Sequence, residues 1–340
     1  MVYNYNIVLG IESTCDETSA AIVDSGRHII SHVIASQIDA HKQFGGVVPE
    51  LASRCHMDAI SDVISDCCAQ AKLSPSSVDL IAVAKGPGLI GSLLVGIQTA
   101  KALAWSLNKP LVGVNHIEAH LYAAIMGCEE AKIAFPALGV ILSGGHTTLV
   151  HMDGIGQYRL IGQTVDDALG EAFDKVAKLL GLGYPGGPAV ERRAASGDPL
   201  AFPFRSGVVK GKPLAFSFSG LKTAVLYTYQ NLLREGPLSD QTVSDLCASF
   251  QRAAFTDITA KIRTCCATMA PQAIFLGGGV SQNRTLRQVL SEAMSVPLFW
   301  PPLELCQDNA AMIGGLGYHV WMKDRLDERH TLDAITRIPF

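Results

Sequence analysis

One strand–turn–strand pattern occurs twice in the chain, and this repeat constrains the fold more than any other feature. The segment NIVLGIESTCDETSAAIVD predicts a strand over residues 7–11, a polar turn over 13–19 and a second strand over 20–23. The segment ALGVILSGGHTTLVHMD follows the same plan after residue 138, with SGGH at its turn. We therefore predict an α/β protein built from two similar lobes.

The boundary between the lobes is predicted where charged residues and a proline interrupt the apolar pattern. No low-complexity linker separates the halves, and the best hinge candidate is GCEEAKIAFP, residues 127–136. We expect the first lobe to comprise residues 1–130 plus about 310–340. The second lobe is expected over residues 131–309, with a helical and basic insertion around 185–245.

Residues 191–234, called the basic segment below, carry an excess of positive charge. Seven lysines or arginines stand there against two acids, a local charge of +5 in a chain of net charge −4. The basic residues are Arg192, Arg193, Arg205, Lys210, Lys212, Lys222 and Arg234. This segment is a candidate for contacting phosphates. The alternative is an ordinary basic face over buried phenylalanines.

The composition favours a protein of a reducing compartment. Nine cysteines occur without a CxxC pair, which argues against a disulfide framework. The N-terminus has no basic segment typical of a signal peptide, and no run of 18 or more apolar residues appears. Charged residues make up only 17% of the chain, which leaves room for a partner interface. We expect a soluble cytoplasmic protein without membrane contact.

Two histidines, His116 and His120, stand four residues apart in VNHIEAHLYAA. A helix turns about 100° per residue, so both rings project from one face, one turn apart. Two ligands of one metal ion need this spacing, but two ordinary helix histidines would share it. A zinc-protease mechanism is excluded, because Glu118 lies about 200° around the helix from His116 and points away from any ion held there.

The sequence GPGLIG, residues 86–91, matches a dinucleotide-binding fingerprint. It follows the predicted strand VDLIAVA and opens an apolar helix, as that fingerprint requires. The acid that binds the ribose about 20 residues further on is missing. Close strand–helix packing, which glycines permit, is the better interpretation.

Glycine-rich turns follow two further predicted strands. Gly144 and Gly145 let backbone N–H groups approach an oxyanion, and the triple glycine at residues 277–279 precedes a helix whose N-terminus suits a nucleotide. A tight β-turn uses the same residues, so one such turn decides nothing. No Walker A lysine follows, which excludes a P-loop ATPase. Two lobes with such turns facing one cleft are the plan of actin-like ATPases and sugar kinases.

Eight motifs, spread almost end to end, resemble those of the bacterial tRNA N6-adenosine threonylcarbamoyltransferases, a family formerly called glycoproteases. They are GIESTCDETS, GGVVPELASRCH, KGPGLIGSLLVG, KPLVGVNHIEAHLYA, LSGGHT, GEAFDKVAKLLGLGYPGGP, FSFSGLKTAV and LGGGVSQN. The resemblance implies an α/β fold of two ribonuclease-H-like lobes of the actin-like ATPase superfamily, with a ligand cleft between them.

The resemblance also implies a metal site. His116 and His120 would bind one divalent ion together with Asp308, which lies in CQDNAAMIG. Iron is favoured and zinc is the alternative, since both accept two imidazoles and a carboxylate. From the sequence alone Asp308 would be a helix N-cap, so this ligand rests on the family.

Substrate-binding residues follow from the resemblance in the same way. Leu142, Ser143, Gly144, Gly145 and His146 would bind the substrate, and Asp174, Gly187, Glu191 and Asn283 would line the nucleotide pocket. Without the family, the two acids would be solvated helix residues, the glycine a turn residue and the asparagine a helix cap. Glu191 stands where many relatives carry aspartate, which keeps the carboxylate but changes its reach.

The implied reaction moves a threonylcarbamoyl group from threonylcarbamoyl-AMP to N6 of the adenosine 3′ of the anticodon in tRNAs that read ANN codons. Asp16 and Glu17 are candidate carboxylates for proton removal or positioning, although acid-rich turns are also common on solvated surfaces. The family implies a paralogous partner subunit and a small P-loop ATPase beside tRNA. An actin-like small-molecule kinase or ATPase, a dinucleotide-dependent oxidoreductase and a non-catalytic subunit are the alternatives.

Overall fold

The structure is a computed structural model that describes residues 6–338, so part of the N-terminal segment weighed as a signal peptide lies outside the described residues. The chain forms two compact units. The first unit comprises the chain up to Glu129, Gly154–Gln157 and the chain from Pro301 onward. The second unit comprises Glu130–Asp153 and Tyr158–Trp300. The last segment of the first unit begins at Pro301, whereas the sequence pattern predicts it at about residue 310.

The first unit contains a five-stranded sheet of order β3-β2-β1-β4-β5. The strands are β1 (Ile7–Glu12), β2 (Glu17–Asp24), β3 (His28–Ser36), β4 (Leu80–Gly86) and β5 (Leu111–Asn115). β2 pairs antiparallel with both β1 and β3, whereas β1, β4 and β5 run parallel. The carboxyl ends of β1, β4 and β5 therefore lie at one edge of the sheet.

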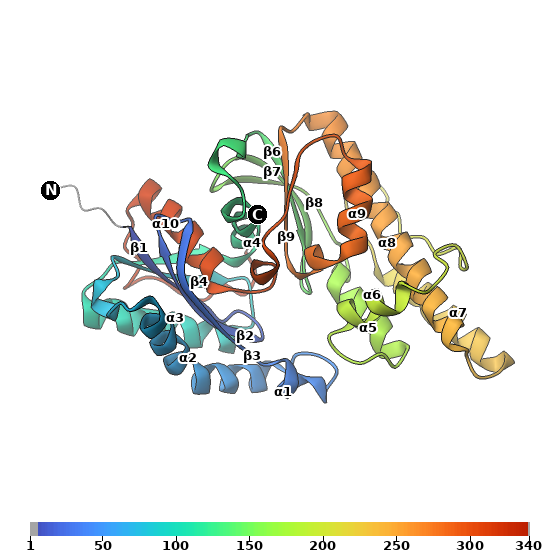
Figure 1. The fold of residues 1–340 in the computed structure, drawn as a ribbon, viewed down its shortest axis with the longest axis horizontal. Coiled ribbons are helices and arrows are strands. Elements are labelled where there is room, and N and C mark those ends of the chain that lie inside the picture. The colour runs from blue at the N-terminus through green and yellow to red at the C-terminus, as the bar shows by residue number, and fades with distance from the viewer. Residues whose placement is uncertain (1–5, 339–340) are drawn as a thin grey trace. The chain divides into compact units, whose positions relative to one another are not determined.

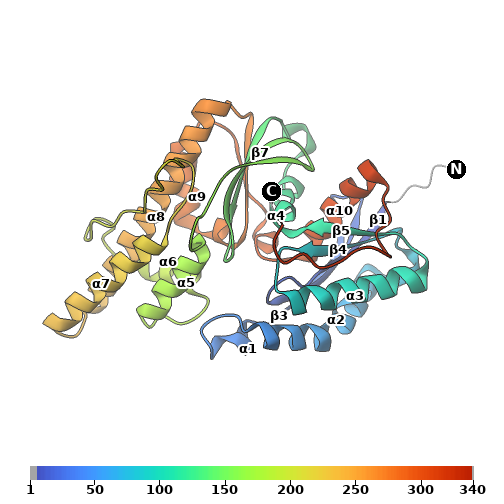
Figure 2. The same cartoon turned by 180° about the vertical axis from the view of Figure 1, so that it is seen from behind.

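Helices cover both faces of this sheet. They are α1 (Ile38–Lys42), α2 (Pro49–Ala71), α3 (Ile90–Leu107), α4 (His116–Met126) and α10 (Ala310–Asp324), with short 3-10 turns η1 (Pro75–Ser77) and η4 (Leu303–Leu305). Leu9 and Ile11 face the core shared with α2 and α3, while Gly10 between them faces α10. Figures 1 and 2 show α10 on the opposite side of the sheet from α2 and α3.

The second unit repeats the topology of the first. Its strands are β6 (Ala137–Leu142), β7 (Thr147–Gly154), β8 (Gln157–Gln163), β9 (Ala273–Gly277) and β10 (Leu298–Phe299). Their order is β10-β9-β6-β7-β8. If β6 to β10 are matched in turn to β1 to β5, this is the strand order of the first sheet, read from its other edge. β6 pairs antiparallel with β7 and parallel with β9, as β1 does with β2 and β4. The predicted α/β plan of two similar lobes is confirmed.

The helices of the second unit gather on one face of its sheet (Figure 1). They are α5 (Leu169–Leu179), α6 (Gly186–Ala194), α7 (Ser219–Glu235), α8 (Asp240–Met269) and α9 (Arg284–Ala293), with 3-10 turns η2 (Glu130–Lys132) and η3 (Gly279–Gln282). The long helix α8 places Phe250 and Phe255 against Phe173 of α5, with ring centroids 5.0 and 6.0 Å apart. This aromatic cluster anchors α8 in the core of the unit.

The first hairpin differs from its prediction. β2 begins at Glu17, and Ser19 pairs with Glu12, so the turn is confined to residues 13–16 instead of 13–19. The residues that read as a polar turn are buried and have internal partners: Thr18 Oγ1 lies 2.8 Å from His56 Nδ1, and Ser19 Oγ donates to the Val33 carbonyl. Most buried polar groups in proteins are hydrogen-bonded, so these residues with their partners can lie in a buried strand.

Helix α3 was not expected to resemble a membrane-spanning segment, yet in the described part of the chain it is the one helix long and apolar enough to cross a membrane. A third of it, 33%, is buried inside the protein. Leu93, Ile97 and Ala100 belong to the core of the first unit. The core helix of a folded protein meets the same criteria of length and composition.

The GPGLIG turn between β4 and α3 serves close packing. A Cβ atom on Gly88 would lie 2.6 Å from the Thr14 carbonyl oxygen, and one on Gly91 would lie 2.2 Å from Ser53 Oγ. The Thr14 carbonyl belongs to the backbone and cannot rotate away, so position 88 requires glycine. The packing interpretation of this motif therefore has direct support.

Gly10 allows α10 to lie directly against β1, which gives a first testable prediction. A Cβ atom at Gly10 would lie 2.2 Å from the Ala310 carbonyl oxygen and 2.6 Å from the Gly314 nitrogen. Because both are backbone atoms, Gly10→Ala should lower the free energy of unfolding by about 1–3 kcal/mol in urea titrations. Gly220→Ala, where a Cβ meets nothing within 4 Å, is the matched control and should not destabilise. Equal stability of the two variants would contradict this packing.

Candidate metal centre and glycine-rich turns

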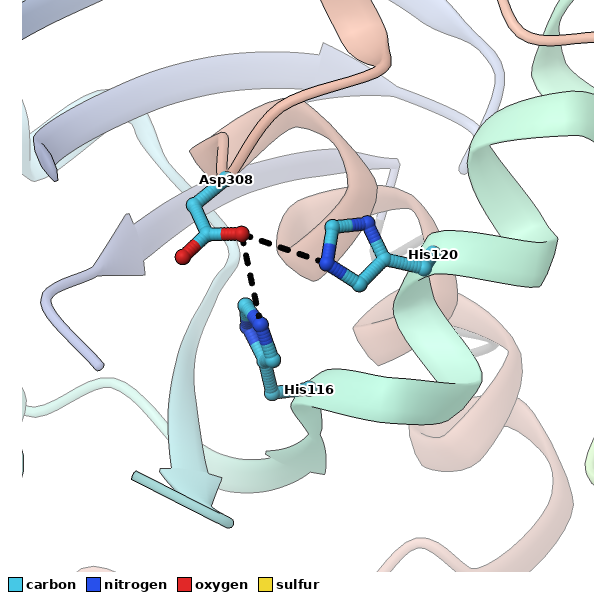
Figure 3. A group of neighbouring side chains, drawn as sticks. All are labelled: His116, His120 and Asp308. Atoms are coloured by element: carbon cyan, nitrogen blue, oxygen red, sulfur yellow. Dashed lines mark ion pairs between the residues drawn. The ribbon is translucent and has the colours of Figure 1, made fainter. Parts of the chain in front are cut away.

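Helix α4 presents His116 and His120 at the carboxyl end of β5. The strand runs straight into the helix because Asn115 is the N-cap, its side chain accepting from Ile117 N at 2.9 Å. His116 is therefore the first helical residue, and His120 follows one turn later on the same face. Both side chains are buried and converge on Asp308 (Figure 3).

Asp308 is not the helix cap that the sequence alone suggests. The N-cap of α10 is Asn309, whose side chain accepts from Met312 N at 2.9 Å and donates to the carbonyl oxygens of Leu305 and Gln307. Asn309 thus fixes the turn before α10 and leaves the Asp308 carboxylate for the histidines. Asp308 Oδ1 lies 3.4 Å from His116 Nε2 and 3.2 Å from His120 Nε2.

The three side chains match the geometry of a metal site. One ligand atom of each lies within 4.8 Å of the others. Ligands about 2.1 Å from a tetrahedral ion lie roughly 3.4 Å from one another. The two contacts between histidine and Asp308, at 3.4 and 3.2 Å, are close to this separation. The His120 ring is buried, and apart from the contact of Nε2 with Asp308 its ring nitrogens have no polar partner among the described residues. Two imidazoles and a carboxylate suit iron or zinc and leave coordination positions open.

The carboxylates of Glu12 and Asp308 favour a positive charge between them. Burial alone would lower the pKa of His116, but the negative charges of Glu12 and Asp308 raise it to about 10. Burial would raise the pKa of Asp308, but His116 and His120 hold it well below its usual range. The Asp308 side chain is 21% exposed, so solvent reaches the cluster from this side.

Glu12 belongs to this cluster and was not predicted. It is the last residue of β1 and is fully buried, and its Oε2 lies 2.9 Å from His116 Nδ1. Its other oxygen, Oε1, accepts from the Thr14 main-chain N–H at 2.5 Å. An acid at the end of an otherwise apolar buried strand was the available signal, because such a charge needs a partner.

Asp16 and Glu17 lie at the adjoining turn and at the start of β2. Glu17 is 6% exposed; its Oε1 accepts from Ser36 Oγ at 2.8 Å, and Oε2 has no partner among the described residues. Burial raises the pKa of Glu17 to about 7. Burial, and then the charge of Asp308, raise the pKa of Asp16. The alternative of a solvated acid-rich turn is therefore wrong for Glu17.

In the second unit, the turn between β6 and β7 is formed by residues 143–146. Ser143 N donates to the His146 carbonyl at 2.8 Å, and His146 N donates to Ser143 Oγ at 3.0 Å. A Cβ atom on Gly144 or Gly145 would meet nothing within 4 Å, so their backbone is open on one side. Leu142, by contrast, is fully buried as the last residue of β6.

The other predicted nucleotide residues lie around α5, α6 and α9 of the same unit. Asp174 Oδ1 accepts from Gly186 N at 2.7 Å, which ties α5 to the start of α6. Glu191 Oε1 accepts from Arg284 N at 2.6 Å, at the N-terminus of α9. Asn283 caps α9 by accepting from Leu286 N and donates to Gln251 Oε1, as the helix-cap alternative expected. A Cβ atom on Gly187 would meet open space.

The basic segment divides into paired and unpaired cations. Arg193 pairs with Asp240, and Lys222 Nζ lies 2.6 Å from Asp167 Oδ2. Arg192, Arg205, Lys210 and Lys212 are exposed or partly exposed and form no ion pair with any described residue. Phe216 and Phe218 are fully buried, as the alternative expected. The loop over residues 205–212 nevertheless presents three unpaired cations around Val208, which is 95% exposed.

Comparisons with known proteins agree on one family. The model of the family TsaD, described as tRNA N6-adenosine threonylcarbamoyltransferase, matches residues 28–315. A protein of that name from Protochlamydia amoebophila is 55% identical, covering 98% of this chain and 98% of its own length. Another from Symbiobacterium thermophilum is 48% identical, over 96% of this chain and 94% of its own length.

Solved structures of low sequence identity support the fold alone. Full-length HypF in a phosphate- and nucleotide-bound form has a TM-score of 0.61 at 14% identity, over 93% of this chain and 55% of that one. Component A of the (R)-2-hydroxyglutaryl-CoA dehydratase of Acidaminococcus fermentans has a TM-score of 0.53 at 14% identity, over 94% of this chain and 100% of that one. The match of the family model and the relatives of 55% and 48% identity show that the chain belongs to the tRNA N6-adenosine threonylcarbamoyltransferase family.

Proposed function

We propose that the chain transfers a threonylcarbamoyl group to N6 of an adenosine in tRNA, the reaction for which its family is named. The cluster of His116, His120 and Asp308 in the first unit carries the proposal, since it offers a chemical centre within a chain of this family. The donor proposed is threonylcarbamoyl-AMP, and the acceptor is the adenosine 3′ of the anticodon in tRNAs that read ANN codons. The alternative of a small-molecule kinase or ATPase is not favoured by the relatives.

The transfer reaction requires few catalytic groups from the protein, because the donor is already activated. The exocyclic amine is a weak nucleophile because its lone pair is delocalised into the purine. The donor compensates, since a mixed carbamic–phosphoric anhydride expels AMP as a good leaving group. The remaining tasks are to align the two substrates, to polarise the carbamoyl carbonyl and to accept a proton.

We assign the metal to His116, His120 and Asp308, with iron favoured and zinc as the alternative. A bound divalent ion would supply Lewis acidity and a template for donor oxygens. The protein has to direct both imidazole Nε2 atoms and one carboxylate oxygen toward the same position. The N-caps Asn115 and Asn309 contribute to this, because they fix where α4 and α10 begin. The partial exposure of Asp308 leaves a side open for substrate.

We assign nucleotide binding to the second unit. The turn over residues 143–146, which follows Leu142, offers open glycine backbone for oxyanions of the donor. Asp174, Gly187, Glu191 and Asn283 are proposed to line the nucleotide pocket. The side chains of Glu191 and Asn283 already bind the first turn of α9, so we propose that they shape the pocket by holding that helix end in place.

For proton removal we propose Glu17, with Asp16 in a supporting electrostatic role. A group with a pKa near the working pH is an efficient general base, and burial raises the pKa of Glu17 to about 7. The unpartnered Oε2 atom is available to accept a proton.

This assignment predicts a pH profile. Glu17 must be deprotonated to act, so the single-turnover rate of transfer should fall as the pH drops below about 7. Glu17→Gln should lower the rate by about 10²- to 10⁴-fold and remove this pH dependence. Asp16→Asn removes a charge that helps to raise the pKa of Glu17, so this variant should keep the pH dependence but shift it to lower pH. A Glu17→Gln variant with the wild-type profile would rule out the assignment.

We further propose that the loop over residues 205–212 contacts phosphates of the tRNA. Its cations Arg205, Lys210 and Lys212 have no internal ion pair, so nothing in the described protein neutralises them, whereas Arg193 and Lys222 are already paired. Within the basic segment Arg193 is less available for a phosphate, because it already binds Asp240.

Charge reversal tests this surface. Lys210→Glu with Lys212→Glu should weaken tRNA binding and reduce the slope of log affinity against log salt by roughly one to two, because each lost phosphate contact contributes about 0.7–0.9. Lys72→Glu with Lys323→Glu produces the same change in net charge at exposed positions outside the basic segment and should leave binding unchanged. Equal losses in both double variants would indicate a general charge effect and exclude the loop.

We propose a cytoplasmic location without membrane contact, and a paralogous partner subunit and a small P-loop ATPase as partners. Exposed large apolar side chains on α2 and α3 of the first unit suit a partner interface: Met57, Ile90 and Trp105 are 59%, 52% and 62% exposed.

The activity itself is tested with protein, unmodified tRNA and threonylcarbamoyl-AMP, followed by mass spectrometry of the nucleosides. Wild-type protein should form threonylcarbamoyladenosine, and His116→Ala should lose both bound metal and transfer. That variant also leaves the buried Glu12 carboxylate without its His116 partner. His120→Ala keeps the Glu12–His116 contact, so it separates loss of metal from loss of folding. Normal modification by metal-free protein, or rapid ATP turnover without tRNA, would refute the proposal.

A further inference from the structure

We propose that Glu12 is a positioning residue, which holds the proton of His116 on Nδ1 so that Nε2 presents its lone pair to the metal. The inference rests on the proposed metal centre and adds to it a residue that sets which nitrogen of one ligand is available. Histidine ligands commonly donate their second N–H to a carboxylate, and this contact fixes both tautomer and ring orientation.

The geometry supports a contact of this kind. Glu12 ends β1, is fully buried, and places Oε2 2.9 Å from His116 Nδ1, on the opposite side of the ring from Asp308. Thr14 Oγ1 lies 3.3 Å from the same nitrogen and is a weaker partner. The ring is therefore held from both sides, with Glu12 at Nδ1 and Asp308 at Nε2.

The second oxygen of Glu12 makes the arrangement specific for a carboxylate. Oε1 accepts from the main-chain N–H of Thr14, a group that can only donate. An amide at position 12 has one acceptor and one donor end. Its oxygen must face Thr14 N–H, so its NH₂ group must face His116 Nδ1. That group requires an acceptor, which places the ring proton on Nε2, where the metal would bind.

Glu12→Gln therefore tests the inference with almost no change in shape. Zinc affinity of the purified full chain, measured by competition with a chelator, should fall about 10- to 100-fold, the usual effect of losing such a partner. Long-range ¹H–¹⁵N correlation spectra of the metal-free variant should show His116 Nδ1 unprotonated. In the wild-type protein Nδ1 should carry a proton.

Glu118→Gln is the matched control, since it makes the same substitution on α4 beside His116. Its carboxylate accepts from Asn115 Nδ2 at 3.2 Å and does not contact the ring, so zinc affinity and the state of Nδ1 should match the wild-type protein. If Glu12→Gln does not fold, Glu12→Asp replaces it: two acceptor oxygens are kept on a shorter side chain, so Nδ1 should stay protonated and affinity should fall less.

The outcomes separate this inference from the metal assignment. Loss of zinc affinity in His116→Ala but not in Glu12→Gln, or a protonated Nδ1 in Glu12→Gln, would overturn the role of Glu12 and leave the metal centre standing. Unchanged zinc affinity in His116→Ala would overturn the metal centre. Equal losses in Glu12→Gln and Glu118→Gln would reduce the effect to general charge near α4 and overturn the inference.

Discussion

The contact of one carboxylate with two buried imidazoles is the interaction on which the candidate site depends. Asp308 comes from the chain just before α10, whereas His116 and His120 come from the first turns of α4. These three side chains meet because α10 packs directly on β1 at Gly10, and because α4 begins at the carboxyl end of β5 in the same sheet. Two asparagine caps then set where each helix begins. The chemistry is thus a consequence of how closely one helix packs on one strand.

A buried cluster of charges is stable only when the charges complement one another. Glu12, His116 and Asp308 alternate in sign when the imidazole carries a proton, and the raised pKa of His116 expresses that balance. A divalent ion in place of a proton would meet the same negative surroundings and a ring already oriented to receive it. The carboxylates and the imidazole rings therefore already have the charge and orientation that a cation needs, which limits the reorganisation on binding.

Patterns that depend on local geometry were predicted from the sequence, and those that depend on burial were not. The two-lobe plan and the shared helix face of His116 and His120 follow from periods of two and 3.6 residues. The assignment of Glu17 to a turn failed, because its polar neighbours find partners inside the sheet. Asp308 and Asn309 both read as caps, and only the course of the backbone decides between them. Glu12 was overlooked, since its partner lies 104 positions away.

The second unit illustrates how a repeated topology can carry a different task. Its sheet has the same strand order as the first, but its predicted nucleotide residues hold helix ends together: Asp174 binds the start of α6, and Glu191 binds the start of α9. The first unit instead directs its polar side chains at one point. The two units therefore share one strand order but differ in what their polar side chains contact.

The central claim is that one metal ion lies between the two imidazoles and Asp308. Anomalous diffraction at the absorption edge of the bound metal, from crystals of protein loaded with iron or zinc, tests it most directly. The account predicts a single strong peak per chain at coordination distance from His116 Nε2, His120 Nε2 and an Asp308 oxygen. A peak at any other group of ligands, with those three side chains still bonded only to one another, would contradict it.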